Sequence, residues 1–141
     1  MAVLLSACRQ PSGASVEKRP AEVRVTMKEH EFEMPGSLTT GALTFRVHNE
    51  GLEDHDLTLI QLPETLDRSL DEQLRGERRM SVLPIAQIKS RSPGKSGFFA
   101  VDLDPGKYGI ICFVRGPDKI PHARKGMSRE FVIEAPDARG A

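Results

Sequence analysis

The amino-acid sequence predicts an all-β fold, a Greek-key β-sandwich with one helical excursion. Short segments in which apolar and polar side chains alternate recur along the chain, as they do in half-buried strands. Clusters of Asn, Asp, Gly and Pro separate these segments, as expected for the turns of a sandwich domain. The length of 141 residues suits a single domain that needs neither a disulfide bond nor a metal ion to fold.

The segments expected to be strands share this alternation. They are residues 22–27 (EVRVTM), 31–34 (EFEM), 42–47 (ALTFRV), 55–62 (HDLTLIQL), 98–103 (FFAVDL), 107–113 (KYGIICF) and 128–134 (SREFVIE). The strong turn signal Asp104-Pro105-Gly106 predicts that residues 98–103 and 107–113 pair as a hairpin. Residues 90–97, a basic stretch rich in Ser, Pro and Gly, are expected to form a loop.

The helical excursion is expected near residues 63–76. Leu66, Leu70 and Leu74 recur every four residues between charged residues, which favours an amphipathic helix that starts near Pro63. The remaining segments lack this spacing, so the helix is an insertion in a β domain.

The N-terminal segment resembles the end of a bacterial lipoprotein signal. In residues 1–8, MAVLLSAC, a small residue precedes Cys8, the residue that would carry the lipid, although the apolar stretch is short and a basic start is missing. We expect residues 9–21 to be a flexible tether, residues 22–135 the folded domain and residues 136–141 a disordered tail. The alternatives for Cys8 are an incidental thiol or a disulfide bond with the other cysteine.

Composition narrows the classes of partner. The 20 basic residues balance the 20 acidic ones, which argues against nucleic acid or an anionic membrane as the main partner. No apolar run approaches the length of about 20 residues that spans a bilayer. Acidic residues are in excess over 50–77 and basic residues over 112–130, which indicates either two solvated faces or a docking patch.

Three metal-binding side chains lie close together near the end of the chain. The segment 112–127, CFVRGPDKIPHARKGM, contains Cys112, His122 and Met127. A thiolate, a thioether and imidazoles are the ligands that suit copper in both of its oxidation states. In a lipoprotein Cys112 would be the only thiol left in an oxidising compartment, and an unpaired thiol there needs a reason.

A second histidine is needed to complete such a site. His30 lies in a charged turn, and His48 is expected to point to solvent from its strand. His55 opens a strand directly after a loop, so its side chain can project at one end of the sandwich. We therefore favour His55. A harder ion held by Glu53, Asp54, His55 and Asp56 is disfavoured, since neighbouring strand residues face opposite sides and cannot form a compact cage.

Each of these residues also has a purely structural interpretation. Cys112 could be a small buried apolar residue, His122 could cap the loop by hydrogen bonding, and Met127 could fill the core. The joint occurrence of Cys, His and Met in this order favours the metal site.

The two motifs FRVHNEGLEDHDLTLI and PGKYGIICFVRGPDKIPHARKGM resemble the cupredoxin (blue copper) family, in particular an uncharacterised bacterial branch similar to plastocyanin and azurin. The resemblance extends over residues 22–134. It implies one copper ion with His55, Cys112 and His122 as equatorial ligands and Met127 as axial ligand. The loop of nine residues between Cys112 and His122 is longer than in plastocyanin and azurin and within the range of copper nitrite reductases.

Two further residues belong to the motif around the first histidine. Asn49 ends the preceding strand, as the family pattern expects, and Asp56 stands where many members have asparagine. Both are expected to lie just outside the copper ligands, where the Asp56 carboxylate would stabilise Cu(II) and lower the reduction potential.

The resemblance implies one-electron transfer in the bacterial cell envelope, and not an enzyme. The protein would be periplasmic or otherwise extracytoplasmic, lipid-anchored through Cys8 and monomeric. An exposed edge of His122 would be surrounded by Arg115, Arg124 and Lys125, which would dock a redox partner with an acidic patch.

Three alternatives remain. The same ligands would serve a copper buffer or chaperone, and a metal-free cupredoxin-like domain could be a structural or interaction module. A hydrolase with Cys112 as nucleophile and His122 as base lacks any recognisable set of oxyanion donors.

Overall fold

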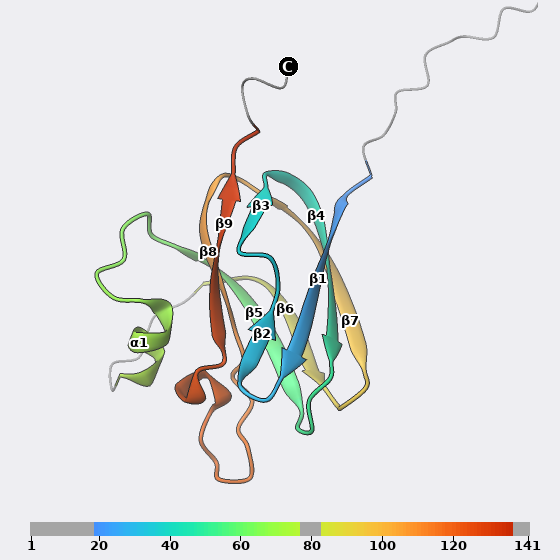
Figure 1. The fold of residues 1–141 in the computed structure, drawn as a ribbon, viewed down its shortest axis with the longest axis vertical. Coiled ribbons are helices and arrows are strands. Elements are labelled where there is room, and N and C mark those ends of the chain that lie inside the picture. Colours follow the sequence, from blue (N-terminus) through green and yellow to red (C-terminus); the bar gives the residue numbers. More distant parts are fainter. Residues whose placement is uncertain (1–18, 77–82, 137–141) are drawn as a thin grey trace, which may run out of the picture.

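The computed structural model describes residues 19–76 and 83–136, which form two β-sheets that pack face to face (Figure 1). The four-stranded sheet has the order β2 (Glu31–Glu33), β1 (Ala21–Lys28), β4 (Gly41–Asn49) and β7 (Ser96–Leu103). The five-stranded sheet has the order β3 (Ser37–Thr39), β9 (Ser128–Glu134), β8 (Gly106–Ile111), β5 (His55–Leu62) and β6 (Pro84–Arg91). The predicted all-β sandwich is confirmed.

The core lies between the sheets because alternate residues of each strand point inward. In β4, Phe45 and Val47 are buried while Arg46 between them is exposed. The ring of Phe45 stacks on Phe99 of β7, its partner in the antiparallel ladder, with 4.9 Å between ring centroids. Phe131 of β9 approaches the same ring from the other sheet at 6.1 Å.

Strand β5 is buried on both faces because the helix covers its outer side. Ile60 and Leu62 pack with Leu70 of helix α1 (Leu70–Arg75) in a second, smaller core. A Cβ atom on Gly109 of β8 would lie 2.6 Å from Leu70 Cδ2, so this glycine allows the close approach of the helix. Helix α1 begins after Ser69, whose hydroxyl accepts a hydrogen bond from Glu72 N–H. A helix within the predicted stretch 63–76 is confirmed, but its expected start near Pro63 is wrong, because α1 begins at Leu70.

The predicted hairpin between residues 98–103 and 107–113 is wrong. Strand β7 pairs with β4, whereas β8 pairs with β5 and β9 of the other sheet, so the turn at Asp104-Pro105 crosses between the sheets. The turn residues are compatible with both connections, and the choice depends on which partner buries each strand.

Two strands were not predicted. Strand β3 has only three residues, and β6 begins with Pro84 at the edge of its sheet and buries only Ile88, so neither shows clear alternation. The predicted loop 90–97 shrinks to residues 92–95, between β6 and β7.

One end of the sandwich gathers segments that are distant in sequence. The turn between β1 and β2, the loop between β4 and β5 and the segment after β8, which contains the 3-10 helix η1 (His122–Lys125), all lie at the lower end in Figure 1. Cys8 and the outer parts of the predicted tether and tail lie outside the described residues. Within the described ranges, no helix has the length and apolar character required to cross a membrane.

Candidate metal centre

The fold itself brings the two ends of the candidate site together. Strand β8 runs antiparallel to β5, with Ile111 opposite Thr58, so Cys112 emerges from the end of β8 beside the start of β5. His55 is the first residue of β5, and Asp56 N–H lies 3.5 Å from Cys112 Sγ.

Backbone hydrogen bonds fold the segment after β8 back over this end. His122 N–H donates to Val114 O at 2.8 Å, and Met127 N–H donates to His122 O at 3.0 Å. Cys112 N–H in turn donates to Met127 O at 3.1 Å. The excursion from Cys112 to Met127 is therefore closed, and His122 at the start of η1 returns to the cysteine.

Three of the predicted ligands converge on one point. His55 Nδ1 and His122 Nδ1 are 3.1 Å apart, and Cys112 Sγ lies 3.6 Å from His122 Nδ1 and 3.9 Å from His55 Nδ1. All three side chains are fully buried. The structure thus joins a residue of the first motif to two residues of the second across more than fifty positions of sequence.

The dimensions of this triangle fit a metal ion at its centre. Protein-bound zinc, a guide to first-row ions, binds imidazole nitrogen at about 2.0 Å and thiolate sulfur at about 2.3 Å. With bond angles of roughly 100–130°, such bonds separate the two nitrogens by about 3.1–3.6 Å and nitrogen from sulfur by about 3.3–3.9 Å. The observed distances lie within these ranges.

Met127 lies next to this triangle. It is fully buried in the same core cluster as Cys112, and its backbone is hydrogen bonded to both Cys112 and His122. This position is compatible with the weak axial ligand that the sequence predicts, and also with the alternative of a core side chain.

Asn49 organises the loop that carries the first histidine. Its buried side-chain amide donates to Glu53 O at 2.8 Å and to Arg91 O at 2.7 Å, and its side-chain oxygen accepts from Gly51 N–H at 2.8 Å. Three backbone groups are thereby satisfied by one residue, which holds the loop 49–55 in a single shape.

Asp56 joins β5 to the cysteine segment. Its carboxylate accepts a hydrogen bond from Phe113 N–H at 2.8 Å, while its own N–H points to Cys112 Sγ. Both groups next to the predicted ligands, Asn49 and Asp56, are therefore part of the framework around the site.

Burial sets the protonation of the predicted ligands before any ion binds. Burial raises the pKa of the Cys112 thiol to about 12, and the Asp56 carboxylate adds to the effect. Burial, together with the neighbouring His122 ring, lowers the pKa of His55. At neutral pH Cys112 is a protonated thiol and His55 is a neutral imidazole, ready to bind an ion through nitrogen. Within the described residues Cys112 forms no disulfide bond, and Cys8, with which a disulfide bond was only an alternative, lies outside them.

Two carboxylates approach the far sides of the imidazole rings. Glu53 Oε2 lies 2.7 Å from His122 Nε2, and Glu29 Oε1 lies 3.6 Å from His55 Nε2. Partial burial raises the pKa of Glu29, but hydrogen bonds from Leu52 N–H and Glu53 N–H outweigh it and leave this pKa below its usual value. Carboxylates behind metal-binding histidines fix ring orientation and tautomer.

Sequence reasoning missed this outer layer. Glu29 and His30 lie in the turn KEHEFE and Glu53 in the loop NEGLED, both of which read as solvated turns. The acidic residues around His55 in the sequence were the only signal that could have indicated carboxylates near the site. His30 lies with its ring centroid 5.0 Å from that of His122.

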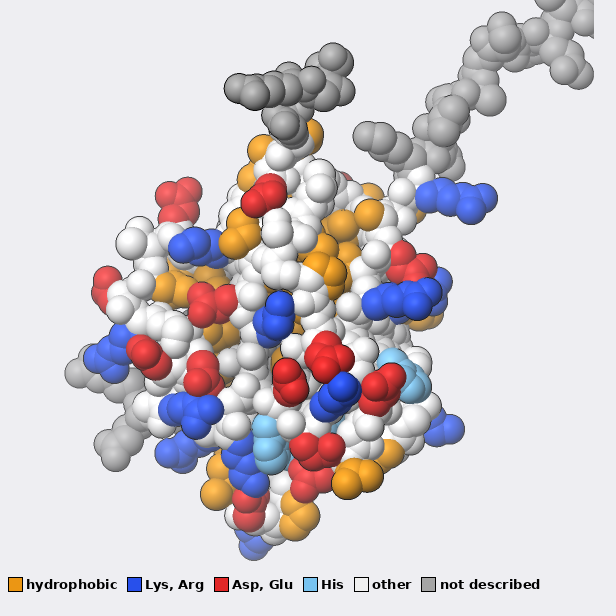
Figure 2. Space-filling view, viewed as in Figure 1, with side chains coloured by type: hydrophobic (Ala, Val, Ile, Leu, Met, Phe, Trp, Pro, Cys, Tyr) orange, Lys and Arg blue, Asp and Glu red, His pale blue; other side chains and the backbone are white. Residues whose placement is uncertain are grey.

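The expected exposed edge of His122 is wrong. The ring is fully buried, because the neighbouring Glu53 and His30 cover it. Of the three basic residues expected around it, Arg124 is exposed, Arg115 donates to Lys119 O, and Lys125 pairs with Asp118. Figure 2 shows acidic and basic side chains interspersed over this end, so no uniformly basic face is present in that view.

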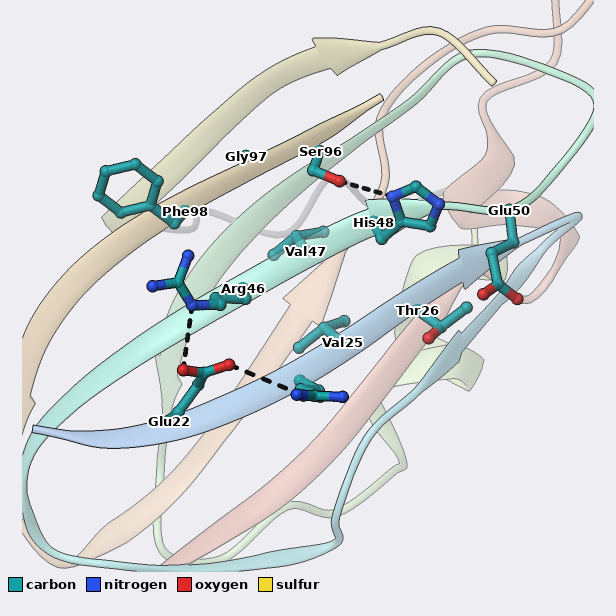
Figure 3. Close-up of a pocket in the computed structure, with 11 residues that line it drawn as sticks. Glu22, Val25, Thr26, Arg46, Val47, His48, Glu50, Ser96, Gly97 and Phe98 are labelled. Atoms are coloured by element: carbon teal, nitrogen blue, oxygen red, sulfur yellow. Dashed lines mark hydrogen bonds and ion pairs between the residues drawn. The ribbon is translucent and has the colours of Figure 1, made fainter. Parts of the chain in front are cut away.

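His48, the rejected histidine, lies elsewhere. It sits on the outer face of the four-stranded sheet, where its Nδ1 is 2.5 Å from the Ser96 hydroxyl. It lines an open groove of about 440 Å³ that also holds Phe98, Arg46 and Glu22 (Figure 3). The groove is separate from the metal-ligand cluster.

Solved structures share this fold. Auracyanin A, described as a "blue" copper protein from the green thermophilic photosynthetic bacterium Chloroflexus aurantiacus, aligns with a TM-score of 0.55 at 16% identity, over 82% of this chain and 100% of that one. Reduced auracyanin from the photosynthetic bacterium Roseiflexus castenholzii aligns with a TM-score of 0.52 at 17% identity, over 84% of this chain and 99% of that one. Reduced rusticyanin aligns with a TM-score of 0.53 at 15% identity, over 83% of this chain and 82% of that one.

Identities this low show a common fold, and the cupredoxin-like sandwich expected from the sequence is therefore confirmed. No family model and no curated protein sequence matches the chain.

Proposed function

We propose that this protein binds one copper ion through His55, Cys112, His122 and Met127 and transfers single electrons. The observation that carries the proposal is the buried triangle of His55 Nδ1, His122 Nδ1 and Cys112 Sγ. It occurs on the fold of auracyanin A, a "blue" copper protein by its description.

The bound copper would supply a one-electron couple between Cu(I) and Cu(II). The protein contributes the rest. The soft thiolate and thioether favour Cu(I), the imidazoles accept both states, and the hydrogen-bonded loops keep the ligands in place. A site that changes little between the two states has a low reorganisation cost.

Ligand burial favours electron transfer over copper delivery. A chaperone must present its ligands to a partner that takes the ion, whereas all four proposed ligands here are fully buried. An electron can pass through the protein that covers the ligands, and no ligand has to be exchanged. A copper buffer with slow release is the second candidate, and it is distinguished by the experiment below.

The docking surface would be the same end of the sandwich. Exposed apolar side chains surround the site at Leu52, Phe113 and Ile120, and Arg124 supplies positive charge. We propose a redox partner protein with an acidic patch that contacts this end, with Arg115 and Lys125 contributing at its margin. Its association rate should fall as salt rises.

We also propose an extracytoplasmic location with a lipid anchor at Cys8. The supporting observation is chemical: once Cys8 is lipidated, Cys112 is the remaining thiol, and a metal bond would protect it in an oxidising compartment. Mass spectrometry of the membrane-fraction protein tests this, because an unmodified Cys8 in the mature chain excludes the anchor.

The decisive experiment is a Cu(II) titration of the purified protein followed by visible absorption and electron paramagnetic resonance. We expect one equivalent to produce an intense thiolate-to-copper charge-transfer band that is bleached reversibly by a reductant. Cys112→Ser should remove the band and keep the fold, since the domain is large enough to fold without the metal. His48→Gln, which alters a histidine outside the site, should retain it.

Other results point elsewhere. Cu(I) binding without an intense Cu(II) band would favour the copper buffer. No copper binding by a folded protein would leave a metal-free structural module. Unfolding of Cys112→Ser would show that Cys112 is chiefly a core residue.

A further inference from the structure

A second group of metal-binding side chains lies on the far side of the His122 ring. One ligand atom each from His30, Glu53 and His122 lies within 4.8 Å of the others. The group uses the face of the site opposite to Cys112, because His122 Nδ1 faces the thiol while His122 Nε2 faces Glu53.

The polar atoms of this group are buried and incompletely satisfied. His30 Nε2, Glu53 Oε2 and His122 Nε2 have no hydrogen-bond partner among the described residues, although Glu53 Oε2 and His122 Nε2 are only 2.7 Å apart. These two atoms are in close contact but lack the alignment of a hydrogen bond. Buried polar atoms are nearly always paired, so an unpaired atom on each of these three neighbouring residues favours a bound ion or water at this place.

The backbone holds these residues in place without an ion. His30 adopts a left-handed conformation with φ of 57°, which is unfavourable for a non-glycine residue. Glu50 N–H donates to Met27 O at 2.9 Å, which fastens the β1–β2 turn to the loop that carries Glu53. Glu53 O is itself held by Asn49. A costly turn maintained by its surroundings is a feature of functional sites.

We infer that His30, Glu53 and His122 Nε2 form a second site, for a divalent transition-metal cation of the zinc class, with the His122 ring shared between the two ions. Two imidazole nitrogens and one carboxylate oxygen are a ligand set that zinc prefers, and a fourth position would remain open to water. In its bridged form the inference rests on the proposed copper site, but the three ligands are present without copper.

Metal binding requires the contact between Glu53 and His122 to lengthen. Bonds of about 2.0–2.1 Å in a tetrahedral arrangement place two ligand atoms about 3.3 Å apart, so Glu53 must withdraw slightly from His122 Nε2. The Glu53 side chain is 33% exposed and has room to move. When both nitrogens of His122 bind ions, the ring gives up its Nε2 proton to solvent, so binding of the second ion releases one proton.

The test measures Zn(II) binding by equilibrium dialysis with metal analysis, on two backgrounds. The first is the copper-loaded full chain, in which we expect one further equivalent of Zn(II) with copper retained. The second is the His55→Ala/Cys112→Ser double variant, which cannot hold an ion in the first triangle and should still bind one Zn(II). The second background remains informative if copper never binds, so failure of the proposed function and failure of this inference are distinguishable.

Matched substitutions identify the ligands. His30→Gln and Glu53→Gln should each weaken Zn(II) binding at least about tenfold on both backgrounds, as loss of a metal-site partner does. His48→Gln should leave it unchanged. His30 lies in a partly exposed turn, so His30→Gln is the variant that decides the test if Glu53→Gln fails to fold. Absence of Zn(II) binding on both backgrounds, or binding that ignores His30→Gln, would overturn the inference and leave a buried water or a plain ion pair.

A second readout is independent of affinity. A dication beside the copper should raise the reduction potential of the copper-loaded protein when Zn(II) is added, and His30→Gln should abolish this shift. An equal shift in both proteins would show that Zn(II) acts at some other place.

Discussion

Glu53 Oε2 lies 2.7 Å from Nε2 of His122, and this contact joins the loop after β4 to the ring whose other nitrogen faces Cys112. The sequence predicts that an edge of the His122 ring is exposed, whereas in the structure this edge contacts Glu53. This contact places a buried carboxylate oxygen behind a proposed ligand.

The first prediction follows from this pair. Glu53→Gln should weaken copper binding by about ten- to a hundredfold, because the carboxylate that orients the ring and increases its basicity is lost. Competition with a copper chelator of known affinity measures the change. Glu50→Gln, an exposed acid on the same loop, is the control and should have no effect. Equal affinity in Glu53→Gln and the parent would mean that the contact does not support the ligand.

The second prediction concerns Gly51, which leaves space for the first histidine. A Cβ atom at this position would lie 2.8 Å from His55 Nε2 and 2.5 Å from Glu29 Oε1. Gly51→Ala should displace the Glu29 carboxylate and destabilise the protein by about 1–3 kcal/mol, as overpacking does. Chemical denaturation measures the loss.

Gly36→Ala is the matched control, since its added atom meets nothing closer than 3.7 Å. If both variants unfold at the same denaturant concentration as the parent, the packing around His55 is looser than the structure indicates.

The third prediction is the pH dependence of copper binding. Because burial raises the pKa of Cys112 to about 12, copper must displace the thiol proton throughout the neutral range. The apparent copper affinity should therefore rise about tenfold for each pH unit. His55 should not add to the slope near neutral pH, because its pKa is lowered and the ring is already neutral. Chelator competition at several pH values gives the slope, and a flat profile would contradict the buried thiol.

The same pKa links the stability of the apoprotein to pH. The Cys112 pKa is raised above its ordinary value of 9.0, so the protonated thiol stabilises the folded state below that pH. The free energy of unfolding should fall as pH rises from about 9 toward 12. Cys112→Ser should lose this part of the pH dependence.

The fourth prediction tests the charge next to the first histidine. A carboxylate about 6 Å from copper, at an effective dielectric near 20, stabilises Cu(II) by up to ~3 kcal/mol. That corresponds to roughly 0.1 V for one electron. Asp56→Asn should raise the reduction potential by up to this amount, while its amide oxygen still accepts the Phe113 N–H. Asp54→Asn, at an exposed position two residues earlier, is the control in a voltammetric titration. Identical potentials for Asp56→Asn and the parent would remove Asp56 from the electrostatics of the site.

The strands and the candidate ligands illustrate what could be predicted from sequence. Alternation is a local property, so β1, β4, β5 and β9 were found close to their observed bounds. The order of Cys112, His122 and Met127 within one segment is likewise visible in the sequence, and the side chains lie at the same end of the fold as His55.

Pairing between strands could not be read in the same way. The turn after β7 looked like a hairpin, yet Phe99 stacks against Phe45 of β4 while Tyr108 and Ile110 pack from the opposite sheet. A turn specifies the reversal of the chain and says nothing about which sheet the next strand joins.

The sequence by itself determined the class of fold, the placement of most strands and a set of four soft or borderline ligands. Only the tertiary structure decided that Glu29, His30 and Glu53 surround the imidazoles and that His122 is buried. The physical reason is range: side-chain periodicity and ligand type are carried by neighbouring residues, whereas burial and through-space charge depend on loops that meet only after the two sheets have packed.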